Sequence, residues 1–143
     1  MDVLLSIKPE YVKKIARGEK KYEFRKRIFK SPTINRIFIY SSSPEKRIIG
    51  SFQIGSILKD CPEQLWEQVK DESGIDYLTY CKYFDGKAEA YAIQIVDLKL
   101  FHTPIDPKEL DPSFIAPQSY QYLPKNQYDQ DGEIRSLEHF SAI

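Results

Sequence analysis

The densest group of side chains capable of chemistry lies in residues 18–25, which read GEKKYEFR. Lys20 and Arg25 can pair with phosphate groups, and the planar guanidinium of an arginine can bind one phosphate through two parallel hydrogen bonds. Glu23 can accept a hydrogen bond from the amino group of a base, such as N4 of cytosine, or it can simply hold Arg25 in place. The segment therefore carries the groups that a site for a phosphate-bearing ligand needs.

This segment is expected to form a strand over residues 20–27 with one charged face. Lys21, Arg25 and Arg27 share that face with Glu23, so three cations stand against one carboxylate. In isolation Glu23 and Arg25 would form a surface ion pair worth less than ~1 kcal/mol. The excess of positive charge instead favours a face that attracts an anion.

Lys20 does not share this face on a regular strand, because it has the alternation of Tyr22 rather than that of Glu23. It joins the charged face only if the turn after Gly18 swings it there.

The other candidate ligand-binding residues lie in predicted loops or at a predicted helix end: Lys8, Ser41, Ser42, Ser43, Gln118 and Tyr120. Lys8 stands where a helix would prefer a serine or aspartate cap, so it either has another role or is solvated. The serine loop can offer hydroxyl and backbone N–H groups to phosphate, or can be a plain turn. Tyr120 can stack on an unpaired base beside Gln118, or pack an irregular segment of the core.

The elements around these residues indicate an α+β fold. The expected strands are 4–7, 20–27, 34–40, 47–58 and 88–101, and the expected helices begin at Pro9 and lie within 62–84. In the long strand 47–58, Ile57 breaks the alternation just after Gly55, which predicts a bulge or bend there. A bent strand helps a small sheet curl. We therefore expect a small, curved, partly open β-barrel of five to six strands flanked by helices.

The chain is expected to form one domain over residues 1–124, followed by a polar C-terminal tail over 125–143. Residues 104–124 are proline-rich and are expected to be irregular. Residues 1–59 hold 14 Lys and Arg against 5 Asp and Glu, a net of +9, whereas residues 60–143 hold 7 against 16, a net of −9. This division indicates either two halves that attract each other or a basic surface for an anionic partner.

Composition limits the other classes of protein. No apolar run is long enough to span a membrane, and the N-terminus does not resemble a signal peptide. Cys61 and Cys81 have neither CxxC spacing nor clustered histidines, so we expect no metal site and no disulfide framework. A module that only binds a nucleotide also needs no cofactor. Two free thiols suit a reducing cytoplasm.

Several segments resemble the ASCH domain family, a branch of the PUA-like superfamily, in its prokaryotic and phage-type subgroup. They are LSIKP at 5–9, the pattern G-x-K-x-x-E-x-R at 18–25, YSSSP at 40–44, IGSF at 49–52 and APQSY at 116–120. The resemblance spans roughly residues 3–123. It implies a β-barrel with surrounding helices, a cleft near the G-x-K-x-x-E-x-R segment, and RNA or nucleotide-related ligands.

Three functions remain open on these grounds. The first is a module that recognises single-stranded RNA or a modified nucleotide in a basic cleft. The second is a small hydrolase on the same pocket, with Lys20 and Glu23 as its catalytic residues, acting as a ribonuclease or an acetylcytidine-type amidohydrolase. The amidohydrolases of the family use a threonine where Glu23 stands here, so the resemblance favours the ribonuclease. The third is a protein-interaction module, which would show an exposed apolar patch and no polar pocket.

Overall fold

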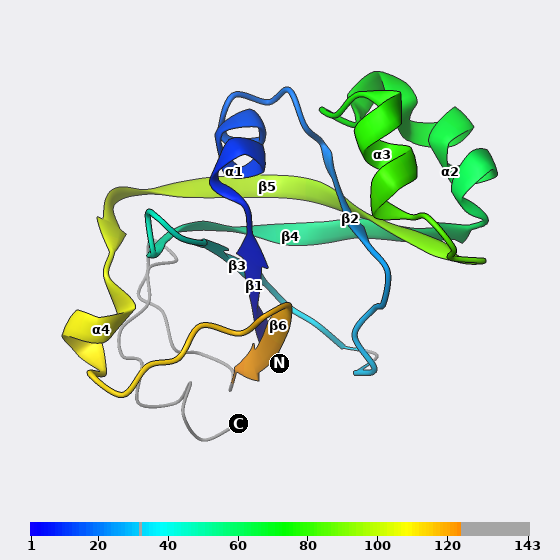
Figure 1. Ribbon diagram of the computed structural model, residues 1–143. Coiled ribbons are helices and arrows are strands. Elements are labelled where there is room, and N and C mark those ends of the chain that lie inside the picture. The colour runs from blue at the N-terminus through cyan, green and yellow to red at the C-terminus, as the bar shows by residue number, and fades with distance from the viewer. Residues whose placement is uncertain (32, 124–143) are drawn as a thin grey trace.

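The computed structural model describes residues 1–31 and 33–123 (Figure 1). Within these residues, six strands and four helices follow one another in the order β1 (Asp2–Ile7), α1 (Pro9–Ala16), β2 (Tyr22–Arg25), β3 (Ile37–Ser41), β4 (Arg47–Asp60), α2 (Pro62–Val69), α3 (Tyr77–Tyr83), β5 (Ala90–Ile105), α4 (Pro107–Leu110) and β6 (Tyr120–Leu123). A short 3₁₀ turn, η1 (Lys70–Glu72), joins α2 to α3. The predicted tail, 125–143, lies outside the described residues.

All six strands form one sheet in the order β2-β5-β4-β3-β1-β6. Only β1 and β3 run parallel, and the other neighbours are antiparallel. The long strands β4 and β5 run across the whole width of the molecule (Figure 1). Their register shifts between Ile54 and Ile57, at the bend predicted from Gly55. The sheet curls into a half-barrel, so the predicted α+β class and partly open barrel are confirmed.

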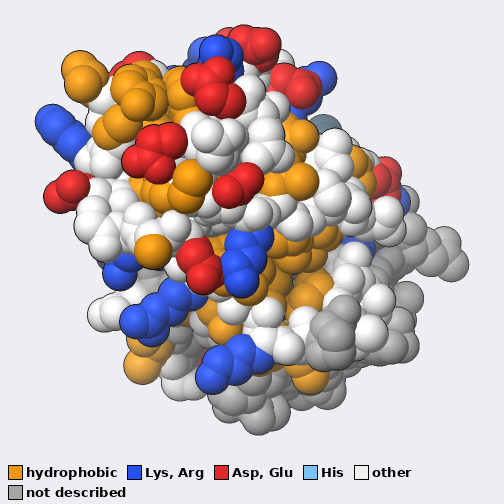
Figure 2. All heavy atoms as spheres, turned by 90° about the vertical axis from the view of Figure 1, so that its right-hand side faces the viewer, with side chains coloured by type: hydrophobic (Ala, Val, Ile, Leu, Met, Phe, Trp, Pro, Cys, Tyr) orange, Lys and Arg blue, Asp and Glu red, His pale blue; other side chains and the backbone are white. Residues whose placement is uncertain are grey.

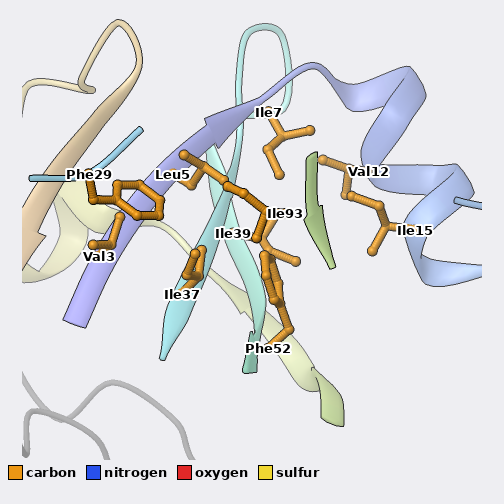
Figure 3. Close-up of a cluster of buried hydrophobic side chains, with 10 residues drawn as sticks. All are labelled: Val3, Leu5, Ile7, Val12, Ile15, Phe29, Ile37, Ile39, Phe52 and Ile93. Carbon is orange, nitrogen blue, oxygen red and sulfur yellow. The ribbon is translucent and has the colours of Figure 1, made fainter. Parts of the chain in front are cut away.

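Three groups of buried side chains hold the sheet and helices together. Figure 3 shows the first group, in which Val12 and Ile15 of α1 meet Ile7, Ile39 and other side chains of the sheet. A second group surrounds Leu4 and Phe38. Since Val3 and Leu4 are both fully buried, β1 is covered on both faces, as its continuous apolar sequence suggests.

The third group fixes the α2–α3 unit on the sheet. Leu65 of α2 and Tyr80 of α3 pack with Phe24 of β2 and the small residues Ala90 and Ala92 of β5. The alanines of β5 thus lie where other elements approach closely. None of the described helices combines the length and the apolar character that crossing a membrane requires.

The proline-rich segment is more regular than the sequence indicated. The strand expected to end at 101 continues to Ile105, α4 follows, and Tyr120–Leu123 forms β6. β6 pairs antiparallel with β1, placing Leu5 opposite Tyr120. A four-residue strand with little periodicity of its own takes its structure from this partner, which lies more than 110 residues earlier in the chain.

Candidate nucleotide-binding site

A cavity of about 680 Å³ opens between the β1–α1 junction, β2, the β3–β4 loop, α3 and the segment that precedes β6. Seven of the ten ligand-binding candidates from the sequence line it: Lys8, Lys20, Glu23, Arg25, Ser42, Ser43 and Gln118. These residues come from four separated stretches of the chain. The structure thus brings together most of the groups that the sequence singled out.

Three candidates lie away from the cavity lining. Arg27 is exposed beyond the end of β2. Ser41 is fully buried as the last residue of β3, and its hydroxyl makes no hydrogen bond among the described residues. Tyr120 contacts Phe29 edge to face, with ring centroids 5.0 Å apart. This contact supports the interpretation of Tyr120 as a packing residue.

Lys20 lies in the cavity because of the turn that follows α1. Gly18 adopts a left-handed conformation with φ +76°, which favours glycine, and the chain then enters β2. The Lys20 side chain is only 2% exposed. Its Nζ donates a hydrogen bond to the Ser73 carbonyl at 2.9 Å and lies 4.5 Å from the centre of the Phe24 ring. The turn therefore swings Lys20 to the side of Glu23.

Burial changes the acidity of this lysine. Removal from water disfavours its charged form and lowers the pKa of Lys20 to about 8, with a smaller contribution from Lys14, while the Glu23 carboxylate opposes the shift. Near neutral pH the amino group of Lys20 is thus mostly charged, but the pH is close to the midpoint of its titration. A lysine of this kind can bind an anion below pH 8 and accept a proton above it.

Arg25 connects three parts of the fold. Its Nη2 donates to the carbonyls of Ser6 at 3.0 Å and Ser119 at 3.2 Å, and its Nε lies 3.8 Å from Oε2 of the buried Glu23. These bonds tie β2 to β1 and to the segment before β6. Two-pronged binding of a phosphate by Arg25 stays a prediction, because Nη2 already has two protein acceptors.

One wall of the cavity comes from α3 and was missed in the sequence. Thr79, Lys82 and Tyr83 line it together with Ile75, and the Tyr83 hydroxyl donates to the Phe24 carbonyl at 3.2 Å. The three helical residues are spaced three and four apart, which places them on one face. That spacing was a signal, but packing of a helix against the sheet explains it equally well without a cavity.

The cavity combines positive charge with aromatic walls. Its lining includes five cations, Lys8, Lys20, Arg25, Lys46 and Lys82, and one carboxylate, Glu23. Four aromatic residues also line it: Tyr11, Phe24, Tyr40 and Tyr83. Lys46 and the two tyrosines Tyr11 and Tyr40 were not candidates from the sequence. Within residues 1–31 and 33–123, no group of at least three His, Cys, Asp or Glu side chains could hold a metal ion.

Comparison with known proteins points to one family. The ASCH domain model matches residues 5–99. An ASCH domain-containing ribonuclease of Zymomonas mobilis is 33% identical over 132 residues, which cover 88% of this chain and 86% of that protein. Ribosomal protein uL22 of Ureaplasma parvum is 28% identical over 98 residues, 66% of this chain but only 31% of that protein.

Solved structures agree with the sequence comparison. The crystal structure of ASCH from Zymomonas mobilis superposes with a TM-score of 0.78 at 33% identity, covering 87% of this chain and 88% of that one. The N-terminal domain of Staphylothermus marinus McrB, at 11% identity and a TM-score of 0.50, shares the fold alone. The family match, the Zymomonas relative and its crystal structure agree: this chain belongs to the ASCH domain family.

Proposed function

We propose that the protein binds RNA by holding one nucleotide of an unpaired segment in the cavity. The observation that carries this proposal is the lining itself, five cations and a single carboxylate beside four aromatic rings. The cations can bind the phosphate of a nucleotide, and its base can stack on the aromatic side chains. A site that bound an apolar surface of another protein would not need the buried charged groups of this cavity.

Each part of the cavity then has a defined role. Glu23, only 5% exposed, is the acceptor for an amino group on the edge of the base. Charged Lys20 and Lys82 face the phosphate. Arg25 keeps Glu23 in place and ties the strands that form the wall.

The free thiols of Cys61 and Cys81 support a reducing compartment such as the cytoplasm.

Titration of short single-stranded RNAs and of nucleoside monophosphates tests this function. We expect Lys20→Met to weaken binding of both at least tenfold, because the substitution removes a buried positive charge but retains most of the volume. Lys13→Met is the matched control, since Lys13 is exposed on α1 and does not line the cavity. Equal losses in the two variants, or no saturable binding by the wild type, would reject the proposal.

A second candidate is cleavage of the bound RNA. Two observations favour it: the Zymomonas relative is named a ribonuclease, and burial lowers the pKa of Lys20 to about 8. A neutral Lys20 can accept the proton of a ribose 2′-hydroxyl as its oxygen attacks phosphorus and the bond to the 5′-oxygen breaks. The proton for that leaving oxygen then comes from water.

The two candidates predict opposite pH dependence. Binding by charged Lys20 should weaken as pH rises through about 8, whereas cleavage by neutral Lys20 should accelerate over the same range. Affinity and product formation measured side by side between about pH 6.5 and 9.5 separate them. Binding that weakens with pH and yields no product identifies a recognition module, and product that rises with pH and is absent in Lys20→Met identifies an enzyme.

A further inference from the structure

Three exposed cations follow β2 and remain outside the cavity. Lys26, Arg27 and Lys30, called the basic ridge below, form no ion pair with any carboxylate in the described parts of the chain. Some other exposed cations are paired, such as Lys59 with Glu89 at 3.1 Å. Others in the described parts of the chain, such as Lys13, Lys99 and Lys108, are exposed and unpaired but isolated, whereas the three cations of the ridge lie within five residues. On the face shown in Figure 2, acidic side chains gather mainly in the upper part, and Lys and Arg groups lie both among them and in the lower part, where red groups are fewer.

The ridge is anchored to the body of the protein. Phe29, between its members, is buried and packs edge to face against Tyr120 of β6. The backbone N–H groups of Lys30 and Ser31 donate to the Tyr122 hydroxyl at 2.8 and 3.1 Å. The backbone that carries these cations is thus held in place before any ligand arrives, which lowers the entropic cost of binding.

The ridge also begins at the cavity. Arg25, which directly precedes Lys26, lines the cavity, and Lys26 Nζ lies 4.7 Å from the ring centre of Tyr83, another lining residue. Charge therefore continues from the wall of the cavity onto the surface. From Lys26 to Lys30 the chain spans at most about 14 Å, so the ridge adds a local stretch of positive charge beside the cavity.

We infer that the basic ridge is a second subsite, which binds phosphates of the RNA strand next to the nucleotide in the cavity. The ligand is then a single-stranded RNA, and a free nucleotide fills only part of the site. This inference rests on the proposed function of the cavity. Cations bind phosphate without regard to base identity, so the ridge contributes affinity and the cavity contributes selectivity.

The test compares two triple variants that lose the same charge. Lys26→Ala/Arg27→Ala/Lys30→Ala removes the ridge, and Lys13→Ala/Lys99→Ala/Lys108→Ala removes three exposed lysines from α1, β5 and α4. Each is titrated with a nucleoside monophosphate and with a single-stranded RNA of about eight nucleotides, at several salt concentrations. Circular dichroism confirms that both variants fold.

We expect the ridge variant to bind the oligonucleotide at least tenfold more weakly than the control, with unchanged affinity for the monophosphate. For the ridge variant, the magnitude of the slope of log K against log salt should fall by about 2. The reason is that each of the three lost phosphate contacts on a single strand contributes about 0.7. Equal oligonucleotide binding and equal slopes in the two variants would overturn the ridge but leave the cavity proposal standing. Wild-type protein that binds neither ligand would overturn the cavity proposal itself.

Discussion

The environment of Lys20 differs strongly from that of an ordinary lysine on a protein surface. It is buried among Phe24, Tyr11 and the Ser73 carbonyl, with Glu23 close enough to raise its pKa and burial strong enough to lower it overall. A protein that needed only stability would place an apolar side chain there. Retention of a charge that is costly to bury is typical of functional sites.

This cost predicts a pH dependence of stability. Between about pH 8, the pKa of folded Lys20, and its unfolded value near 10.4, the unfolded state binds more protons than the folded state. The contribution of Lys20 to the free energy of unfolding should therefore rise with pH in this window, by up to about 3 kcal/mol. Below about pH 8 both states are protonated and the contribution is constant.

Urea unfolding of wild type and Lys20→Met at intervals from pH 7 to 10 measures this effect. Other titrations are shared by the two proteins, so the difference between them isolates Lys20. The wild type should gain stability relative to the variant above about pH 8. A difference that stays constant with pH would show that Lys20 has an ordinary pKa.

At the scale of elements, the connection between η1 and α3 positions Lys20. Gly74 has φ +69°, and a Cβ added there would lie 2.5 Å from Cβ of Lys20. Lys14 Nζ also donates to the Gly74 carbonyl at 2.8 Å. The α2–α3 unit therefore forms one wall of the cavity and also sets the position of Lys20, which packs directly against it.

Gly74→Ala should accordingly harm both stability and binding. The left-handed backbone alone costs about 1–2 kcal/mol for a residue with a side chain, and the collision with Lys20 adds to this. Gly86→Ala is a matched control, because Gly86 has φ +76° but no atom within 4 Å of the added Cβ. We expect Gly74→Ala to be the less stable variant by at least about 1 kcal/mol, and to bind RNA more weakly.

Thermal unfolding and RNA titration of the two alanine variants compare these effects. If both lose the same stability and retain wild-type binding, the contact between Gly74 and Lys20 has no influence on the site.

At the scale of the whole molecule, the sheet is open, with β2 at one edge and β6 at the other. Arg25 of β2 spans this opening by donating to Ser6 and Ser119. A third bond, from the Ser6 hydroxyl to the Pro117 carbonyl at 2.7 Å, secures the same segment before β6. The opening of the half-barrel is thus closed by side-chain bonds to backbone, and the cavity forms beside it.

Arg25→Met should weaken the connection between β2 and the segment before β6. The substitution removes the donor shared by two carbonyls and leaves the buried Glu23 without its guanidinium partner, for a loss of about 2–4 kcal/mol. Arg17→Met is the control, since its ion pair with Glu19 is exposed and should contribute less than about 1 kcal/mol. Denaturant unfolding gives the stabilities, and hydrogen exchange should show faster exchange in β6 for Arg25→Met only. Unchanged β6 exchange would contradict a closing role.

Much of the local structure was predictable because its causes are local. Pro9 begins α1 and Gly18 follows its end, the bend at Gly55 coincides with the shift in register, and Gly74 separates the helical segments. The G-x-K-x-x-E-x-R pattern also located the segment that contributes three charged residues to the cavity. Each of these features depends on the conformational preference or alternation of nearby residues.

The remaining features depend on contacts between distant residues. The sequence could not place Tyr83 and Lys82 opposite Glu23, because packing of α3 on the sheet brings them there. Nor could it assign Arg25 to two backbone carbonyls, or pair Tyr120 with Leu5 across the sheet.

The sequence by itself determined the α+β class, the positions of the main turns and the charged residues available for a site. Only the tertiary structure decided which of them share a cavity, that Lys20 is buried while Arg27 is exposed, and that Tyr120 packs against Phe29. The physical reason is that burial, and with it charge state and ligand access, is a property of the surroundings of a residue, and those surroundings are assembled from segments far apart in the chain.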